Sequence, residues 1–197
     1  MIYLNRIRIP IERVFALKLQ DRYDMHKLVC NFFPQGTEHS FYVHPVIDSN
    51  GKVLVIDSFA TEPANAHDIG FVETKKVSDS FLNHRQFKFM VELNPTKKID
   101  GKRKSLFAQN EVLTQSEKDA RLVNWAIRQF AKSGCVLTSI EFGAYTIEVN
   151  KRSGRVIISN ATGFLKVTDS ELFKQSIIKG IGPSTFLGIG MLRLFPV

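Results

Sequence analysis

The stretch Gly180-Ile-Gly-Pro-Ser-Thr-Phe-Leu-Gly-Ile-Gly-Met-Leu-Arg-Leu194 carries four glycines, at positions 180, 182, 188 and 190. Glycine allows a positive φ or a close approach of the backbone to a ligand, and successive backbone N–H groups in such a loop can bind an anion. The stretch lacks the Gly-Lys-Ser/Thr ending of a nucleotide-binding P-loop and the third glycine of the dinucleotide-binding pattern. Two interpretations remain open: a loop that contacts a phosphate, and a helix C-cap at Gly180 followed by a turn into a last strand, Met191–Phe195.

The composition predicts a globular and basic chain. It has 197 residues, of which 44% are hydrophobic, and a net charge of +8. This length favours one or two domains with a core that needs no disulfide bonds. The excess of positive charge favours an anionic partner, nucleic acid ahead of a membrane surface, although a merely solubilising charge remains the alternative.

The chain offers few signals for export, membranes or metals. Cys30 and Cys135 are its only cysteines, which favours a reducing compartment, and we expect a cytoplasmic location. Residues 1–11 alternate as a strand does, so no signal peptide is predicted, and no apolar run approaches the ~20 residues that span a membrane. No set of His, Cys, Asp and Glu has metal-ligand spacing, so we expect neither a metal nor a cofactor.

A helix is predicted from Asp21, which can cap its N-terminus, to about Phe33. Its apolar residues recur at helical spacing, at positions 25, 28, 29, 32 and 33. Tyr23 and His26 lie at the edge of this stripe, where a side chain can be both held and exposed. We interpret the other histidines, at positions 39, 44, 67 and 84, as ordinary surface or packed residues.

The segments around this helix predict strands. They cover residues 1–9, 39–48, 52–59, 71–77 and 85–93. Arg6 and Arg8 share one face of the first strand, and Asn50-Gly51 predicts the hairpin turn between the second and the third. Residues 63–70 are expected to form a loop that can include a short helix. The order of strand, helix, strand, strand, short helix and strand is the ferredoxin-like βαββαβ pattern.

A run of positive charge follows the break at Asn94-Pro95. It consists of Lys97, Lys98, Lys102, Arg103 and Lys104. One interpretation is a solvated linker, and the other is a basic arm that binds phosphates, which the basic balance of the whole chain favours. The break divides the chain into an expected N-terminal domain of residues 1–94 and a C-terminal domain of residues 95–197.

The second half repeats the alternation of strands and helices. Thr114-x-x-Glu117 predicts a capping box for a helix that ends near Ser133, with Ser116 as the alternative cap. Thr168-x-x-Glu171 predicts a second capping box, for a helix that ends at Gly180. Between them, residues 136–150 and 155–168 are predicted strands around a turn at 151–154. Inward-facing positions are expected to be 123, 126, 127 and 130, then 172, 173 and 177, with Trp125 in the core. This pattern predicts an α+β protein of two similar domains.

Several motifs occur in an order that resembles a known family. They are Met1-Ile-Tyr-Leu-Asn-Arg-Ile7, Tyr23-Asp-Met-His26, Asn94-Pro-Thr-Lys97, Gly101-Lys-Arg103, Gly163-Phe-Leu-Lys-Val167 and the glycine stretch. Over nearly the whole chain, the sequence resembles the CasE (Cse-type) CRISPR repeat-RNA endoribonucleases of the Cascade complex. The resemblance implies two tandem ferredoxin-like, RRM-related domains. It also implies metal-independent cleavage of precursor CRISPR RNA at the base of the repeat hairpin, retention of that hairpin as guide RNA, and contact with other Cascade subunits, chiefly the backbone subunit.

The resemblance further implies roles for single residues. His26 matches the catalytic histidine of the family, and Tyr23 matches its companion tyrosine. The RNA-binding loop of the family corresponds to Gly180, Gly182, Ser184, Thr185, Gly188 and Gly190. Thr185 stands where members of the family carry a lysine. Candidates to contact RNA and to replace this charge are Arg6, Arg8, Lys27 and Arg193.

The chemistry of RNA cleavage fits a histidine. The 2′-hydroxyl next to the scissile phosphate is the nucleophile, and an imidazole with a pKa of about 6.5 suits proton transfer at neutral pH. His26 is predicted to act as general base or general acid, while Tyr23 orients the ribose or shares the proton transfer. The alternative function is a subunit that binds the RNA hairpin without cutting it, which the missing lysine supports. A purely structural subunit leaves the charge and the glycines unexplained, and a metal-dependent nuclease is disfavoured because no carboxylate cluster has suggestive spacing.

Overall fold

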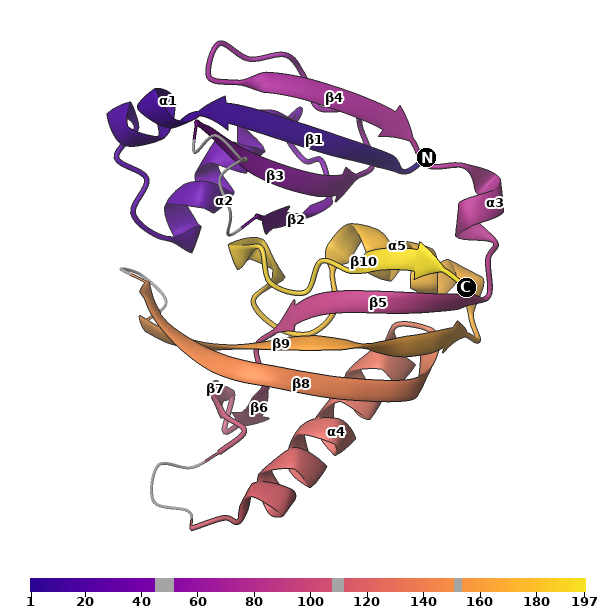
Figure 1. The fold of residues 1–197 in the computed structure, drawn as a ribbon. Helices are drawn as coiled ribbons and strands as arrows, with labels where there is room; N and C mark the ends of the chain where they lie inside the picture. The colour runs from indigo at the N-terminus through magenta and orange to yellow at the C-terminus, as the bar shows by residue number, and fades with distance from the viewer. Residues whose placement is uncertain (45–51, 108–111, 151–153) are drawn as a thin grey trace.

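The computed structural model describes residues 1–44, 52–107, 112–150 and 154–197. These residues form two four-stranded antiparallel sheets, one above the other in Figure 1, and a two-stranded hairpin. Helices lie between the strands along the chain, so the predicted α+β class with two ferredoxin-like units is confirmed. The predicted turn at 50–51 lies outside the described residues, and so do residues 151–153 of the turn predicted at 151–154.

The first sheet comes from the N-terminal part of the chain. Its strands are β1 (Tyr3–Pro10), β2 (His39–Val43), β3 (Val53–Ala60) and β4 (Phe71–Lys76), in the order β2-β3-β1-β4. Between β1 and β2 lie α1 (Ile11–Ala16), in a segment for which we predicted no regular structure, and α2 (Arg22–Cys30). Ile7 and Ile9 of β1 form one buried cluster with Leu28 and Val29 of α2, so this helix covers that face of the sheet.

The second sheet comes from the rest of the chain. Its strands are β5 (Gln86–Leu93), β8 (Cys135–Asn150), β9 (Gly154–Val167) and β10 (Arg193–Pro196), in the order β10-β5-β9-β8. Its helices are α4 (Gln115–Lys132) and α5 (Ser170–Lys179). Both helices pack on the same face, because Phe89 of β5 contacts Phe130 of α4 and Phe87 contacts Phe173 of α5.

β5 joins a different sheet from the one expected. We predicted that it completes the N-terminal sheet, but it pairs with β9 and β10, while β4 takes the place beside β1. The apolar residues of β5 are fully buried in the second core: Phe87, Phe89, Val91 and Leu93. Alternation shows that a strand has a buried face, but it does not tell which sheet the strand joins. By sheet membership, the change between units falls at α3 (Asp79–Leu82), ahead of the expected boundary at residue 94.

Two of the predicted helix starts are confirmed, and one is shifted. Asp21 caps α2, and the capping box of Thr114 and Glu117 opens α4. α5 is capped by Asp169 instead of Thr168, because the Asp169 carboxylate accepts hydrogen bonds from two backbone N–H groups of the first turn. A side-chain acceptor at the N-cap satisfies donors that the helix itself leaves unpaired.

The buried stripe of α4 is rotated from the predicted one. Trp125 is buried, as predicted, and its indole N–H donates a hydrogen bond of 2.9 Å to the carbonyl of Thr96. Leu122 is buried, whereas Ile127 is 46% exposed. On α5, Leu172 is 41% exposed, although we expected it to face inward.

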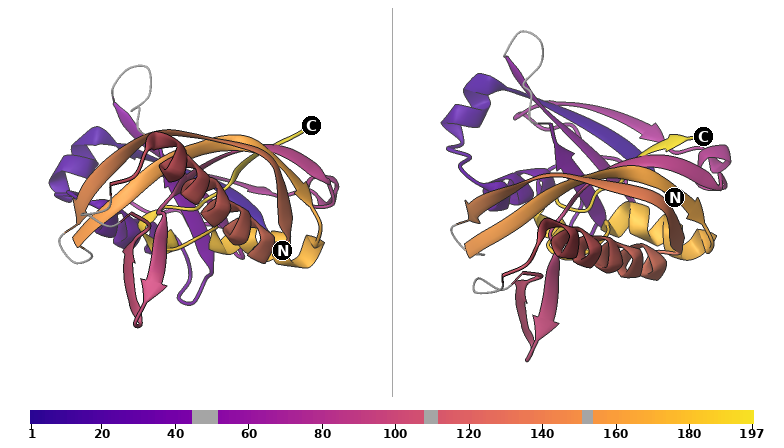
Figure 2. Two further views of the ribbon diagram at one scale, coloured as in Figure 1. Left: turned by 90° about the horizontal axis from the view of Figure 1, so that it is seen from below. Right: turned by 60° about the horizontal axis from the view of Figure 1, so that its bottom comes forward.

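A hairpin of β6 (Thr96–Ile99) and β7 (Lys102–Ser105) projects beside α4, away from the second sheet (Figure 2). It contains the five cations that we interpreted as a basic arm. In the parts of the chain that the structure describes, no helix combines the length and the apolar character needed to cross a membrane.

Candidate functional site

The glycine stretch packs between α2 and the second sheet. Gly180 ends α5 with a φ of 76°, the short 3₁₀ helix η1 (Thr185–Leu187) follows, and the chain then enters β10. Side chains of the stretch and of β9 form a small buried cluster: Leu187, Ile189, Val156 and Ile158. Because Tyr23 of α2 packs against this cluster, the stretch holds α2 in place relative to the second sheet.

Two of the glycines make contacts that a side chain would block. A Cβ atom at Gly190 would lie 2.3 Å from the carbonyl oxygen of Ile181, and one at Gly188 would lie 2.6 Å from the ring of Phe41. The glycines therefore have a packing reason that needs no ligand. The predicted C-cap at Gly180 is correct, and contact of the loop with phosphate stays a proposal.

His26 lies on the side of α2 that faces η1. Its ring meets Phe186 of η1 edge-on, with 5.8 Å between ring centroids, and lies nearly parallel to Phe41 at 6.4 Å. Tyr23, one turn earlier, has its ring centroid 6.3 Å from that of His26. Lys27 places Nζ 4.8 Å from the centroid of the Tyr23 ring. Tyr23, His26 and the glycine stretch therefore meet at one place.

The surroundings of His26 keep its ring neutral. Burial lowers the pKa of His26 below its ordinary value, and the nearby His39 lowers it further. At neutral pH the imidazole is therefore mostly uncharged, which is the form that can accept a proton. Its side chain is half-buried, so one part of the ring remains accessible.

Two neighbours of His26 were missed in the sequence. Cys30, one turn further along α2, has its Sγ atom 3.8 Å from each ring nitrogen of His26. His39 of β2 stacks on His26 with 6.3 Å between ring centroids. One donor atom from each of these three residues lies within 4.8 Å of the others. Our interpretation of His39 as an ordinary surface or packed histidine without company is therefore wrong. The expectation that no metal binds stays a prediction. The spacing of His26 and Cys30 was a usable signal, but only the fold brings in His39.

A cavity of about 490 Å³ opens beside η1. Its walls are the loop from Gly182 to Phe186, the β6–β7 hairpin and the start of β9. Three of the lining residues are cations: Arg103, Lys104 and Arg155. Phe186 lines this cavity and also contacts His26, so the histidine and the cationic cavity share a wall. Arg155 was not among the residues that we predicted.

The predicted basic arm is an ordered hairpin with like charges opposite each other. Lys97 pairs in register with Lys104, and Lys98 pairs with Arg103. Like charges directly across two strands destabilise the pairing. An anion bound beside this hairpin would relieve that repulsion, which supports the interpretation as a phosphate-binding arm. Lys102 stands at the turn end of β7.

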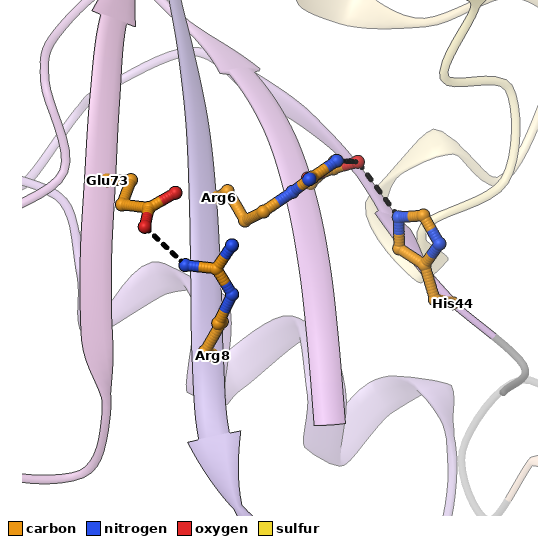
Figure 3. A network of polar contacts seen from close by, with 5 residues as sticks. Arg6, Arg8, His44 and Glu73 are labelled. Carbon is orange, nitrogen blue, oxygen red and sulfur yellow. Dashed lines mark hydrogen bonds and ion pairs between the residues drawn. The ribbon is translucent and has the colours of Figure 1, made fainter. Parts of the chain in front are cut away.

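Arg6 and Arg8 lie elsewhere, on the other face of the first sheet (Figure 3). Arg6 donates hydrogen bonds of 2.7 and 2.9 Å to the two carboxylate oxygens of Asp57, and Arg8 forms an ion pair with Glu73. His44 contacts the same Asp57 carboxylate at 2.8 Å. Because side chains alternate along a strand, both arginines face away from α2. They are therefore not beside His26, and their charges are already balanced.

Arg22, the first residue of α2, ties this helix to the second sheet. Its guanidinium forms ion pairs with Glu148 of β8 at 2.7 Å and with Glu92 of β5 at 2.9 Å. It also donates a hydrogen bond of 3.4 Å to the carbonyl of Leu187 in η1. Arg22 and Glu92 are largely buried, so this ion pair fixes the position of α2 relative to the second sheet and is not a surface contact. No local pattern predicts this contact, because its partners Glu92 and Glu148 are far away along the chain.

Comparison with known proteins places the chain in a family. The model of a family described as CRISPR associated protein matches residues 2–196. The chain therefore belongs to this family, and the resemblance to CasE proteins is confirmed.

Individual relatives share the fold over their full length. The CRISPR-associated endoribonuclease Cse3 of Thermus thermophilus is 24% identical over an alignment of 212 positions, which covers 95% of this chain and 96% of that protein. A structure of Thermus thermophilus Cse3 bound to an RNA representing a pre-cleavage complex superposes with a TM-score of 0.77, at 21% identity and with 99% of each chain covered. Cas6e from Escherichia coli gives a TM-score of 0.68 at 18% identity, over 99% of this chain and 100% of that one.

Proposed function

We propose that this protein is an endoribonuclease that cleaves precursor CRISPR RNA at the base of the repeat hairpin. The observation that carries the proposal is the position of His26, half-buried and neutral, one turn from Tyr23 and sharing Phe186 with a cavity lined by cations. Membership of the CRISPR associated family supports it. So does the likeness in fold to a Cse3 that was captured with RNA.

The reaction needs proton transfers and stabilisation of charge. The 2′-hydroxyl next to the scissile phosphate attacks the phosphorus, and the bond to the 5′-oxygen of the next nucleotide breaks. His26 takes the proton of the 2′-hydroxyl or supplies one to the departing 5′-oxygen, and Tyr23 orients the ribose or shares this transfer. The products are a 2′,3′-cyclic phosphate and a 5′-hydroxyl. A positioned acid or base of this kind contributes typically ~10²–10⁴ in rate.

The cations of the cavity and of the β6–β7 hairpin bind the negatively charged phosphates of the RNA. The major groove of A-form RNA is too deep and narrow for most side chains, so the protein recognises mainly shape and hairpin ends. The β6–β7 hairpin provides cations for the duplex backbone, together with Lys27 beside Tyr23. The glycine stretch, including Ser184 and Thr185, forms the wall against which the scissile end lies.

Arg155 is the best-placed substitute for the lysine that Thr185 replaces. Both residues line the same cavity. Arg6 and Arg8 form ion pairs with carboxylates. The guanidinium of Arg193 lies over the ring of Tyr42, 4.0 Å from the ring centroid. We therefore assign contact with the phosphate charge to Arg155.

After cleavage, the protein keeps the hairpin and remains with the guide RNA as a Cascade subunit in the cytoplasm, in contact chiefly with the backbone subunit. The likeness in fold to a chain of a CRISPR RNA-guided surveillance complex supports this step, with a TM-score of 0.63 at 12% identity. The cation-lined cavity supports it too, because phosphate contacts persist after the chain is cut.

The alternative is a subunit that binds the hairpin without cutting it. Thr185 favours this alternative, because the residue in this position carries no charge. Under this alternative, His26 and Tyr23 are contact residues only, and the cavity holds intact RNA.

The test is a cleavage assay in EDTA with the repeat hairpin from the same CRISPR locus. Wild type is expected to cut once and to leave a 2′,3′-cyclic phosphate, while His26→Ala binds the hairpin and cuts at least ~100-fold more slowly. His44→Ala, on the other face of the sheet, is the matched control and keeps the wild-type rate. Tight binding without cutting by wild type would establish the alternative, and full cleavage by His26→Ala would remove His26 from the mechanism.

A further inference from the structure

Three metal-binding side chains converge beside η1. His26 and Cys30 are one helical turn apart on α2, and His39 stands at the start of β2. The Sγ atom of Cys30 is 3.8 Å from either nitrogen of His26 and 4.0 Å from Nε2 of His39. One donor atom from each residue lies within 4.8 Å of the other two, and all three residues are half-buried.

The orientation of His39 suits a metal ligand. Its Nδ1–H donates a hydrogen bond of 3.2 Å to the carbonyl of Thr37, because a carbonyl can only accept. Its Nε2 therefore carries the free lone pair, and this is the nitrogen that faces Cys30. The ring is also stacked on Phe33 with 5.0 Å between centroids. Metal-bound histidines are held in this way, with the outer nitrogen bonded to a carbonyl or carboxylate.

The distances are close to those that a small cation requires. Zinc bonds of about 2.0–2.1 Å to nitrogen and about 2.3 Å to sulfur place neighbouring ligand atoms of a tetrahedron roughly 3.5 Å apart. The observed separations exceed this value by a few tenths of an ångström to about 1.3 Å, so side-chain rotation closes the site without moving the backbone. Since both nitrogens of His26 are equally far from Cys30, a turn of the imidazole aims either of them at the ion.

We propose that His26, Cys30 and His39 form a binding site for Zn²⁺. Two imidazoles and a thiolate are a donor set that zinc favours over the hard cations Mg²⁺ and Ca²⁺. Cys30 loses its proton to solvent when the metal binds, and the fourth position stays open to water or to an oxygen of a phosphate. The ion occupies the same place as the RNA end that approaches His26.

Zinc at this site inhibits cleavage. The metal takes the lone pair of His26 that proton transfer needs, so the bound form is inactive and a chelator restores it. This consequence rests on the proposed function, whereas the binding of the ion does not. A polar cluster that merely packs together would bind no stoichiometric metal.

The first experiment measures binding alone, on the reduced protein without RNA. One equivalent of Co²⁺ should produce sulfur-to-cobalt charge-transfer absorption together with the visible bands of a four-coordinate ion, and added Zn²⁺ should displace it. Cys30→Ser should abolish the charge-transfer band, and His39→Gln should weaken binding by at least the ~10–100-fold typical for loss of an outer-shell partner. His84→Gln, far from the cluster, should bind as wild type does.

The second experiment measures cleavage of the repeat hairpin, in Zn²⁺ and in EDTA, as a ratio for each variant. Wild type and His84→Gln should be inhibited by zinc and restored by EDTA, and Cys30→Ser and His39→Gln should lose most of this inhibition. The site is refuted if no equivalent of Co²⁺ binds, or if Cys30→Ser and His39→Gln bind it as wild type does. An absence of cleavage in EDTA would overturn the proposed function and leave the cobalt spectrum as an independent result on the site.

Discussion

Histidine or arginine side chains lie beside both faces of the first sheet, and the two faces differ in the groups that contact these side chains. On the α2 side, His26 and His39 stack on each other and on phenyl rings, and burial lowers the pKa of both. On the far side, Arg6 and Arg8 are bound by carboxylates. Residue type alone made both faces candidates for RNA contact. The α2 side therefore has neutral imidazoles without a carboxylate partner among their contacts described above, whereas the charges of the far side form ion pairs that stabilise the fold.

On the far face, Arg6 and His44 both contact the carboxylate of Asp57. Although burial disfavours a charge on Asp57, the hydrogen bonds from Arg6 and His44 hold the pKa of this carboxyl below its ordinary value. A bidentate arginine pair of this kind is a strong and oriented contact. RNA would have to displace it before reaching Arg6, so this face contributes to stability.

Gly190→Ala is expected to give the largest effect, because the His26 side depends on the glycine stretch. The new Cβ would lie 2.3 Å from the carbonyl oxygen of Ile181, and the φ of Gly190 is 92°. The clash adds to a backbone strain that by itself costs ~1–3 kcal/mol. Urea unfolding should show a loss above this range. Gly101→Ala, at a φ of 75° with nothing within 4 Å, should lose only ~1–2 kcal/mol. Equal losses would mean that the stretch relaxes around the added methyl group.

Phe186→Ala is expected to give the second-largest effect, a loss of affinity for RNA. Phe186 is 46% exposed beside His26, where a base can stack on it. Stacking of one base on an aromatic ring is worth ~1–3 kcal/mol, so the Kd for the repeat hairpin should rise accordingly. Phe71→Ala is the control, because Phe71 is 73% exposed opposite Arg8 on the far face. A similar loss in both variants would contradict the assignment of the two faces.

Removing charge from the hairpin should change the salt dependence of RNA binding. The double variant Arg103→Gln with Lys104→Gln should weaken binding and lower the slope of log K against log[salt] by about 1 for each lost phosphate contact. The double variant Arg6→Gln with Arg8→Gln should leave the slope unchanged. An effect confined to the second variant would reverse our interpretation of where the RNA lies.

The smallest expected effect is a pH-dependent loss of stability in Asp57→Asn. The folded pKa of Asp57 is lowered, so its contribution is present above the unfolded value of 3.8 and is lost as the pH falls through the folded pKa. The difference in unfolding free energy between wild type and variant should therefore shrink below about pH 4. Glu171→Gln, in an exposed pair with Lys174, should change stability little at any pH. A constant difference for Asp57→Asn across pH 3–7 would show that packing, not charge, is lost.

Local signals made most of the elements predictable. The caps at Asp21 and Thr114 are short-range hydrogen bonds, and the alternation of β5 is a property of a few consecutive residues. The two helix stripes were less accurate, since Ile127 and Leu172 point outward. Position on a helix surface depends on what the helix packs against, which periodicity alone does not include.

The candidate site was predictable only in part. Tyr23 and His26 share one helix edge because they are three residues apart, a spacing that any helix places on one side. His39 comes from a strand whose place beside α2 depends on pairing with β3. Arg155 reaches the cavity through the long β8–β9 hairpin. Neither residue has a local signal that links it to His26.

The sequence by itself determined most of the helices and strands, the basic charge and the pairing of Tyr23 with His26, because these depend on interactions over a few residues. α1 and the β6–β7 hairpin are among the exceptions. It also determined the family through motifs that extend along the whole chain. The tertiary structure alone decided that β5 belongs to the second sheet, that Cys30 and His39 surround His26, and that carboxylates occupy Arg6 and Arg8. Each of these outcomes depends on contacts between segments far apart in the chain. A pattern along the sequence indicates which side chains are buried, but it does not indicate which residues they contact.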